Sequence, residues 1–189
     1  MAPRLQKRFQ TEIVDRFVKE HGLKNRMHVP FVEKVVVSMG IKEATTDVKI
    51  LDQAALELAA ITGQKPLVTK AKKSIAGFHL RQDQPVGLKI TLRPPRMYEF
   101  LDRLFNVAMP KIRDFRGYSE SGFDDSGNYT LGIQEQLIFP EINFDEVKRI
   151  QGMNITFVTT TRDKKMARAL LEYLGLPFRK DSTPSKSNK

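Results

Sequence analysis

The residues most able to do chemistry in this chain are cations gathered between Gly63 and Arg96. This segment holds eight Lys or Arg residues against a single acid, Asp83. The cations are Lys65, Lys70, Lys72, Lys73, Arg81, Lys89, Arg93 and Arg96. They lie among strand-forming residues, and a folded cationic hairpin offers a surface to the phosphates of a polyanionic backbone. The segment therefore indicates nucleic-acid binding.

Residues that could carry out catalysis are sparse. The adjacent carboxylates Asp124 and Asp125 could hold a metal ion or act as acid and base, but adjacent acids in a Gly- and Ser-rich segment are more often turn residues. The chain has no cysteine, and its histidines, His21, His28 and His79, lack the spacing of metal ligands. We therefore expect no metal site, no cofactor and no enzyme activity. A magnesium-dependent nuclease that uses the two acids is kept as a minor alternative.

The composition is that of a basic globular protein. The chain has 189 residues, and its 32 Lys and Arg against 22 Asp and Glu give a net charge of +10. This length suits one domain, which we expect over residues 1–180, with residues 181–189 as a disordered polar tail. No apolar run approaches the roughly 20 residues that span a bilayer, and the charged N-terminus does not resemble a secretory signal. We therefore expect a cytoplasmic protein with no membrane contact and a phosphate-bearing partner.

The hydrophobic pattern predicts a mixture of helices and hairpin-linked strands. Apolar residues at every third or fourth position predict helices over residues 5–21, 47–62, 96–109 and 162–174. β-branched and alternating runs predict strands over residues 32–39, 66–70, 77–81, 86–93, 128–133 and 153–160. This order implies an α+β fold: a single, mainly antiparallel sheet with helices packed on one face and a projecting basic β-hairpin. The other face of the sheet then stays open.

Alternation along residues 86–93 predicts which side chains reach that open face. The residues that alternate with the buried Leu88, Ile90 and Leu92 are Lys89, Thr91 and Arg93. Most aromatic residues occupy helix core positions, so RNA recognition should depend on shape, phosphates and 2′-hydroxyls. The aromatic residues in or near loops are Phe78, Phe115, Tyr118 and Phe123.

Several long segments carry a family resemblance. They are GQKPLVTKAKKSIAGF at 63–78, VGLKITLRPPRMYEFLDRL at 86–104, PKIRDFRG at 110–117, GNYTLGIQEQLIFPEI at 127–142, GMNITFVTT at 152–160 and ARALLEYLGLPFRK at 167–180. With these segments in one order over about residues 5–180, the chain closely resembles the bacterial large-subunit ribosomal protein L-five family, which binds 5S rRNA. The resemblance implies a structural constituent of the central protuberance of the large ribosomal subunit, in contact with 5S and 23S rRNA.

The resemblance also implies which residues meet rRNA. The family's rRNA contacts match Ser38, Gln64 and Thr91 in this chain. Ser38 stands where the family usually has Asn, and a serine can form fewer hydrogen bonds. We add Lys89 and Arg93 to the rRNA-binding set, because alternation places them on the same face as Thr91.

A second surface in the family approaches tRNA in the peptidyl site through the tip of the basic hairpin. The matching residues are Lys70, Lys72, Lys73, Ser74 and Gly77. The family also contacts neighbouring ribosomal proteins, including one in the small-subunit head, for which residues 141–151 are our candidate segment. At 123–129 the chain reads FDDSGNY where the family usually reads FDGRGNY, which weakens any phosphate contact there. An RNA-binding regulator or chaperone outside the ribosome stays open as an alternative.

Overall fold

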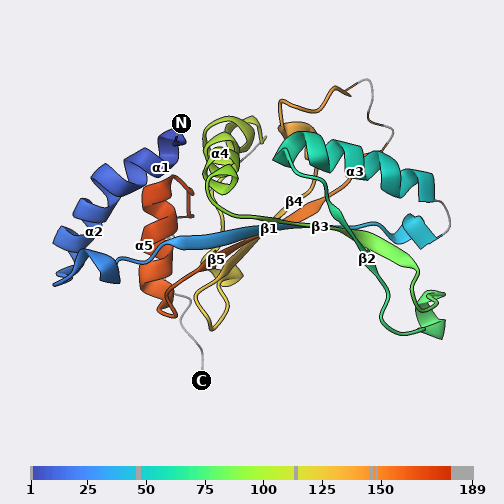
Figure 1. Ribbon diagram of the computed structural model, residues 1–189, viewed down its shortest axis with the longest axis horizontal. Helices are drawn as coiled ribbons and strands as arrows, with labels where there is room; N and C mark the ends of the chain where they lie inside the picture. The colour runs from blue at the N-terminus through green and yellow to red at the C-terminus, as the bar shows by residue number, and fades with distance from the viewer. Residues whose placement is uncertain (1, 46–47, 113–114, 145–146, 148, 180–189) are drawn as a thin grey trace.

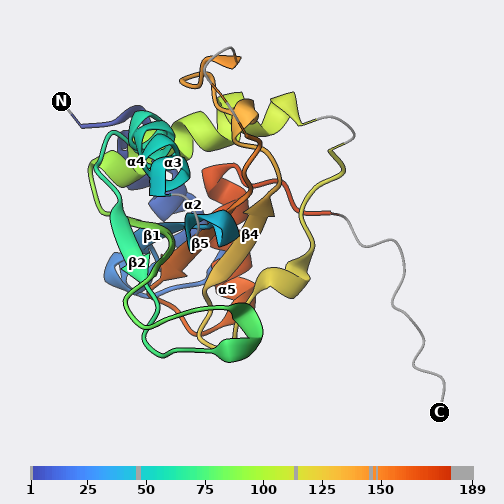
Figure 2. The same cartoon turned by 90° about the vertical axis from the view of Figure 1, so that its right-hand side faces the viewer.

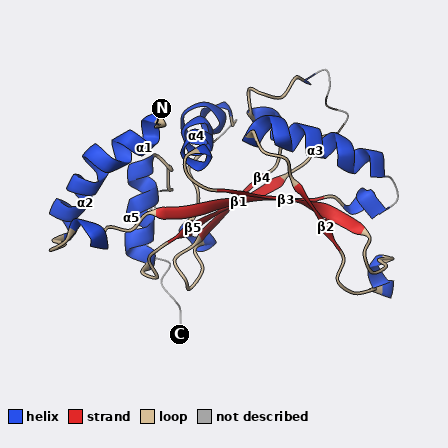
Figure 3. Ribbon diagram, in the orientation of Figure 1, coloured by secondary structure: helices blue, strands red, loops and turns tan. Residues whose placement is uncertain are grey.

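One five-stranded sheet organises the chain, with strand order β2-β3-β1-β5-β4 and every pairing antiparallel. The computed structural model describes residues 2–45, 48–112, 115–144, 147 and 149–179 (Figure 1). The strands are β1 (Val32–Gly40), β2 (Leu67–Lys70), β3 (Pro85–Leu92), β4 (Tyr129–Ile133) and β5 (Met153–Thr159) (Figure 3). Runs of β-branched residues favour this extended backbone, most clearly in β1.

Helices cover one face of the sheet. They are α1 (Arg4–Arg8), α2 (Val14–His21), α3 (Val48–Thr62), α4 (Arg96–Arg103) and α5 (Lys164–Leu174). In Figure 1, α1, α3 and α4 lie above the sheet, whereas α2 and α5 lie at its left end, and Figure 2 shows α3 and α4 on the same side after a quarter turn. The predicted α+β class with one antiparallel sheet is confirmed. None of the helices in the described parts of the chain is both long and apolar enough to cross a membrane.

The core fills the space between the sheet and the helices. Along β1, Val35, Val37 and Met39 are at most 2% exposed, while the alternate residues Val36 and Ser38 are half-buried. This alternation follows from the period of two in a strand and fixes which side chains face the helices. In β3 the same rule buries three hydrophobic side chains and leaves the alternate positions accessible, as predicted; the buried ones are Leu88, Ile90 and Leu92.

The basic segment contains β2, β3 and their connection. β2 pairs with β3 from Leu67 opposite Lys89 to Lys70 opposite Pro85, with an irregularity near the end of the ladder. Residues 71–84 join the two strands and extend beyond the rest of the sheet at the lower right of Figure 1. We call residues 70–84, which include Lys70 at the end of β2, the tip. The tip is therefore attached at both ends to strands of the main sheet.

The predicted strand over residues 77–81 is wrong. Residues Ala76–Phe78 form a 3-10 turn, and the neighbouring residues Ile75 and Leu80 form only an isolated bridge. His79 adopts φ 52°, a left-handed conformation that does not occur in a regular strand. The partner of β2 is consequently β3. The predicted disordered tail, 181–189, lies outside the described residues.

Candidate nucleic-acid interface

The open face of the sheet carries polar side chains in register across neighbouring strands. Ser38 of β1 lies opposite Lys89 of β3 on one side and opposite Asn154 of β5 on the other. A second row, two residues along the strands, holds Thr91 of β3 and Thr156 of β5 on either side of the apolar Val36 of β1. Because adjacent strands lie about 4.8 Å apart, these groups form a regular array. The face thus offers mostly uncharged hydrogen-bonding groups at fixed spacing.

Gln64 lies at the edge of this face, directly after α3. Gly63 ends the helix with φ 68°, a conformation that glycine adopts without strain. The hydroxyl of Thr62 donates to the Gln64 carbonyl oxygen at 3.2 Å, and the Gln64 side-chain amide donates to the Thr91 carbonyl oxygen at 3.5 Å. The structure therefore brings Gln64 next to Thr91.

The two cations predicted for the open face differ in their surroundings. Lys89 is exposed and has no ion pair within the described part of the chain. The Arg93 guanidinium lies 3.7 Å from a carboxylate oxygen of Glu33, and both side chains are about half exposed. Such a pair adds little stability, but it partly neutralises the positive charge of Arg93. Of the two cations, only Arg93 thus has a neighbouring carboxylate in the part of the chain that the structure describes.

The tip is a folded loop although it lacks a strand ladder. The backbones of Ile75 and Leu80 exchange two hydrogen bonds, of 2.9 and 3.1 Å. The Ser74 hydroxyl accepts a hydrogen bond from the Gln82 N–H at 3.0 Å, and the Gln84 side-chain oxygen accepts one from another backbone N–H of the tip at 2.7 Å. Ser74, predicted to contact tRNA, therefore also stabilises the conformation of the tip.

The cations of the tip point to solvent. Lys70, Lys72 and Lys73 are exposed, as is Arg81, and none of these four forms an ion pair with any residue that the structure describes. A lysine ammonium on a flexible stem can reach phosphates as a mobile point charge. The predicted tRNA-binding residues thus lie together in a region of unneutralised positive charge.

Asp124 and Asp125 have structural partners. The Asp124 carboxylate accepts backbone N–H groups of Ser126 at 2.9 Å and of Asn128 at 2.7 Å, and the Asn128 side-chain amide at 2.8 Å. This last bond, chiefly, lowers the pKa of Asp124 below its usual value. Asp125 pairs with Lys164 at 2.8 Å. Among the residues described, no group of three His, Cys, Asp or Glu side chains could hold a metal ion, so the acids form a turn.

The segment proposed for the contact with the small subunit is tied to the helices. Arg103 of α4 pairs with Glu141 and donates to the Ile61 carbonyl oxygen at 2.9 Å. The buried Gln136 accepts a hydrogen bond from the Gln151 N–H at 2.6 Å. These bonds hold both ends of the segment 141–151, of which residues 145–146 and 148 lie outside the description.

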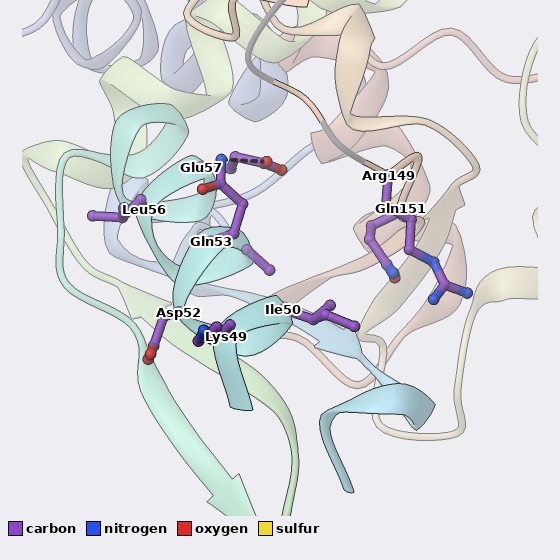
Figure 4. A pocket seen from close by; sticks show the side chains of 9 residues that line it. Lys49, Ile50, Asp52, Gln53, Leu56, Glu57, Arg149 and Gln151 are labelled. Atoms are coloured by element: carbon purple, nitrogen blue, oxygen red, sulfur yellow. Dashed lines mark hydrogen bonds between the residues drawn. The ribbon is translucent and has the colours of Figure 1, made fainter. Parts of the chain in front are cut away.

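A pocket of about 540 Å³ lies between this segment and α3. Figure 4 shows Arg149 and Gln151 across the pocket from Ile50 and Gln53. Arg149 also forms an ion pair with Glu43 at 2.7 Å. The residues that line the pocket include carboxylates but no serine, cysteine or histidine, the side chains that most often act in nucleophilic catalysis.

Sequence reasoning missed the polar residues that β4 and β5 add to the open face. Asn154 is exposed and Thr156 is half-buried, and the Thr156 hydroxyl lies 2.9 Å from that of Thr130 on β4. The alternation along residues 153–159 could have revealed these side chains. The strand order, which places β5 next to β1, was needed to show that they extend the same surface as Ser38.

Comparison with known proteins identifies the family. Residues 25–81 match the family model for ribosomal protein L5, and residues 85–178 match the model for the ribosomal L5P family C-terminus. A large ribosomal subunit protein uL5 from Geobacter sulfurreducens is 58% identical over 176 residues, which cover 93% of this chain and 98% of the relative. Proteins of the same name from Anaeromyxobacter sp. and Trichlorobacter lovleyi are each 56% identical, over 95% and 93% of this chain and over 99% and 98% of their own lengths. The chain therefore belongs to the ribosomal protein L5 family, and it is a structural, non-enzymatic protein of the large ribosomal subunit.

Proposed function

We propose that this ribosomal protein binds 5S rRNA through the open face of its sheet and contacts peptidyl-site tRNA through the tip. The observation that carries the proposal is the separation of two surfaces with different chemistry. The face presents ordered hydrogen-bonding groups around Ser38 and Thr91, and the tip presents exposed cations that form no ion pair with the described residues.

On the open face, Ser38, Gln64 and Thr91 fix the register of the protein on the 5S rRNA. Hydroxyl and amide groups can donate to phosphate oxygens and exchange hydrogen bonds with 2′-hydroxyls. Lys89 and Arg93 neutralise phosphates and release counterions, which adds affinity without specifying a sequence. The contact with 23S rRNA is part of the same proposal and follows from the net charge of +10.

At the tip, Lys70, Lys72 and Lys73 hold the sugar–phosphate backbone of the tRNA, while Ser74 and Gly77 allow a close approach. Phosphate contacts do not depend on base sequence. A tip of this kind therefore suits the peptidyl site, where the tRNA changes with each codon.

We also propose that the segment 141–151 contacts a protein of the small-subunit head. Two large hydrophobic side chains support this assignment, since Phe144 is 74% exposed and Ile150 is 56% exposed. Exposed apolar side chains of this size at one site are typical of protein–protein contacts. Residues 1–180 would act as one domain in this arrangement, because a single cluster of buried hydrophobic side chains runs through the sheet and helices.

The decisive experiment removes charge from one surface only. The double variant K72A/K73A should weaken retention of peptidyl-site tRNA on large subunits and leave binding of the isolated protein to 5S rRNA nearly unchanged. A matched control is K7A/K24A, which removes two equally exposed cations far from the tip in sequence. The slope of log affinity against log salt is negative, and each lost phosphate contact should reduce its magnitude by about 0.7 to 0.9.

Two outcomes would contradict the proposal. Equal loss of 5S rRNA and tRNA binding in K72A/K73A would show that the surfaces are not separate. If sucrose-gradient sedimentation found the chain apart from large subunits, the alternative of a regulator or chaperone outside the ribosome would be favoured instead.

A further inference from the structure

We propose that Phe78 stacks on an unstacked base of the tRNA that the tip contacts, and that Gly77 leaves room for that base. This inference rests on the proposed function of the tip. It adds to the contacts with phosphates a contact with one base, whose strength is insensitive to salt.

Phe78 is exposed to a degree that packing does not explain. Its side chain is 72% exposed, whereas the core residues Phe17, Phe100 and Phe157 are at most 1% exposed. Ile75, three residues earlier, is 46% exposed and adds a second apolar group to the tip. An aromatic ring left in water beside several cations costs solvation free energy unless a partner covers it.

The backbone around Phe78 is held by hydrogen bonds within the tip. The Phe78 N–H donates to the Ile75 carbonyl oxygen at 3.2 Å, and the His79 N–H donates to the Ala76 carbonyl oxygen at 3.0 Å. The left-handed His79, with φ 52°, ends the turn. A ring held on such a turn loses little conformational entropy on binding, and this preorganisation favours affinity.

The fold itself does not require glycine at position 77. A Cβ at Gly77 would meet no atom within 4 Å, and its φ is not in the left-handed region. By contrast, Gly127 has φ 76°, and a Cβ there would lie 2.1 Å from the Thr161 carbonyl oxygen. Packing within the protein therefore requires glycine at position 127 but not at position 77. Close approach of a ligand next to Phe78 accounts for Gly77.

The charge of the tip identifies the ligand as nucleic acid rather than protein. Lys72, Lys73 and Arg81 flank the apolar pair, and Asp83 is the single acid between residues 63 and 96. A stacking site for unpaired nucleotides has two elements: cations along the sugar–phosphate backbone, and an aromatic ring beside them on which a base stacks. Stacking tolerates any base, because every base has a π-face, so it is compatible with a tRNA that changes with each codon.

The test uses large subunits assembled with full-length variants of this chain and measures retention of deacylated tRNA in the peptidyl site. F78A should weaken retention roughly tenfold, which is the size of effect expected for loss of one stacked base. F78L should be about as weak as F78A, since it keeps the apolar bulk but not the ring, and F78W should restore retention. The salt slope should stay at the wild-type value in all three variants, because no phosphate contact is lost.

The controls separate this inference from the function on which it rests. F31A removes an exposed phenylalanine outside the tip, with a side chain 45% exposed, and should leave retention unchanged. If F78A retains tRNA normally while K72A/K73A does not, the stacking inference is wrong and the tip function stands. If both variants retain tRNA normally, both are wrong. If F78L behaves as wild type, apolar contact without stacking is sufficient, and the inference is overturned.

Discussion

The tip and the open face of the sheet differ in how their side chains are held. On the face, the strand ladder sets the position of each group, so that Ser38 lies opposite both Lys89 and Asn154. In the tip, the backbone is held by a few local hydrogen bonds, and the cationic side chains have no partner in the part of the chain that is described. The face combines hydrogen-bonding groups set by the strand ladder with a few cations, among them Lys89 and Arg93, whereas the tip is strongly positive and its cations are exposed.

This difference suggests how one small protein could serve two RNA partners. A rigid array of hydroxyl and amide groups suits an RNA that is bound permanently, since geometry must match only once. Long cations on a compact loop suit an RNA that enters and leaves, because electrostatic attraction speeds association and tolerates variation. RNA binding at the two surfaces should therefore respond differently to substitutions that change charge, to the removal of a hydroxyl group and to the salt concentration.

The largest effect should come from placing an acid in the centre of the open face. S38E should weaken 5S rRNA binding by about a hundredfold or more, because like charges brought together cost several kcal/mol and the new carboxylate would also neutralise Lys89, which lies opposite. A filter-binding titration with isolated 5S rRNA measures this. S121E, which places the same charge in an exposed loop, is the control. Unchanged binding by S38E would remove the open face from the interface.

A smaller effect should come from removing one hydroxyl from the face. T91V should weaken 5S rRNA binding by about fivefold, the equivalent of a hydrogen bond of roughly 1 kcal/mol, and the salt slope should not change. T11V is a matched control, because Thr11 is exposed in the N-terminal helical segment, far from the face in sequence, and its hydroxyl already donates to the Lys7 carbonyl oxygen at 3.0 Å. A change of salt slope in T91V would contradict the expectation that Thr91 contributes a hydrogen bond and no charge.

The smallest effect on stability should accompany G77A. Alanine fits the 3-10 turn at this position, so the melting temperature should stay the same or rise slightly, by the equivalent of about 0.4–1 kcal/mol. Retention of peptidyl-site tRNA should nevertheless fall a few-fold. G127A is the contrasting variant and should lower the melting temperature, since its Cβ would clash with backbone at φ 76°. A G77A protein that retains tRNA fully would show that no ligand approaches this glycine closely.

Most of the architecture could be predicted from the sequence, because local patterns determine it. The strand over 32–39 follows from a run of β-branched residues, and the helix ending at Gly63 follows from its apolar period and a glycine terminator. The side chains of Lys89 and Thr91 were placed on the open face by alternation alone. The strand predicted over residues 77–81 was wrong because a short run with apolar residues predicts a strand whether or not a partner strand exists.

Three features of the site depended on tertiary contacts. Strand order decided that Asn154 and Thr156 extend the surface of Ser38. The approach of Glu33 decided that Arg93 is partly neutralised whereas Lys89 is not. Empty space around Gly77 and the exposure of Phe78 distinguished these residues from the glycines and phenylalanines that packing requires.

The sequence by itself determined the α+β class, the excess of positive charge and its concentration between residues 63 and 96, since these depend on residue types and on periods of two or of 3.6. Only the tertiary structure decided which strand pairs with β2, which polar residues share one face, and which cations lack a neighbouring acid. The physical reason is that pairing across a sheet and the distance between charges join residues far apart in the chain. No local pattern of residues contains that information.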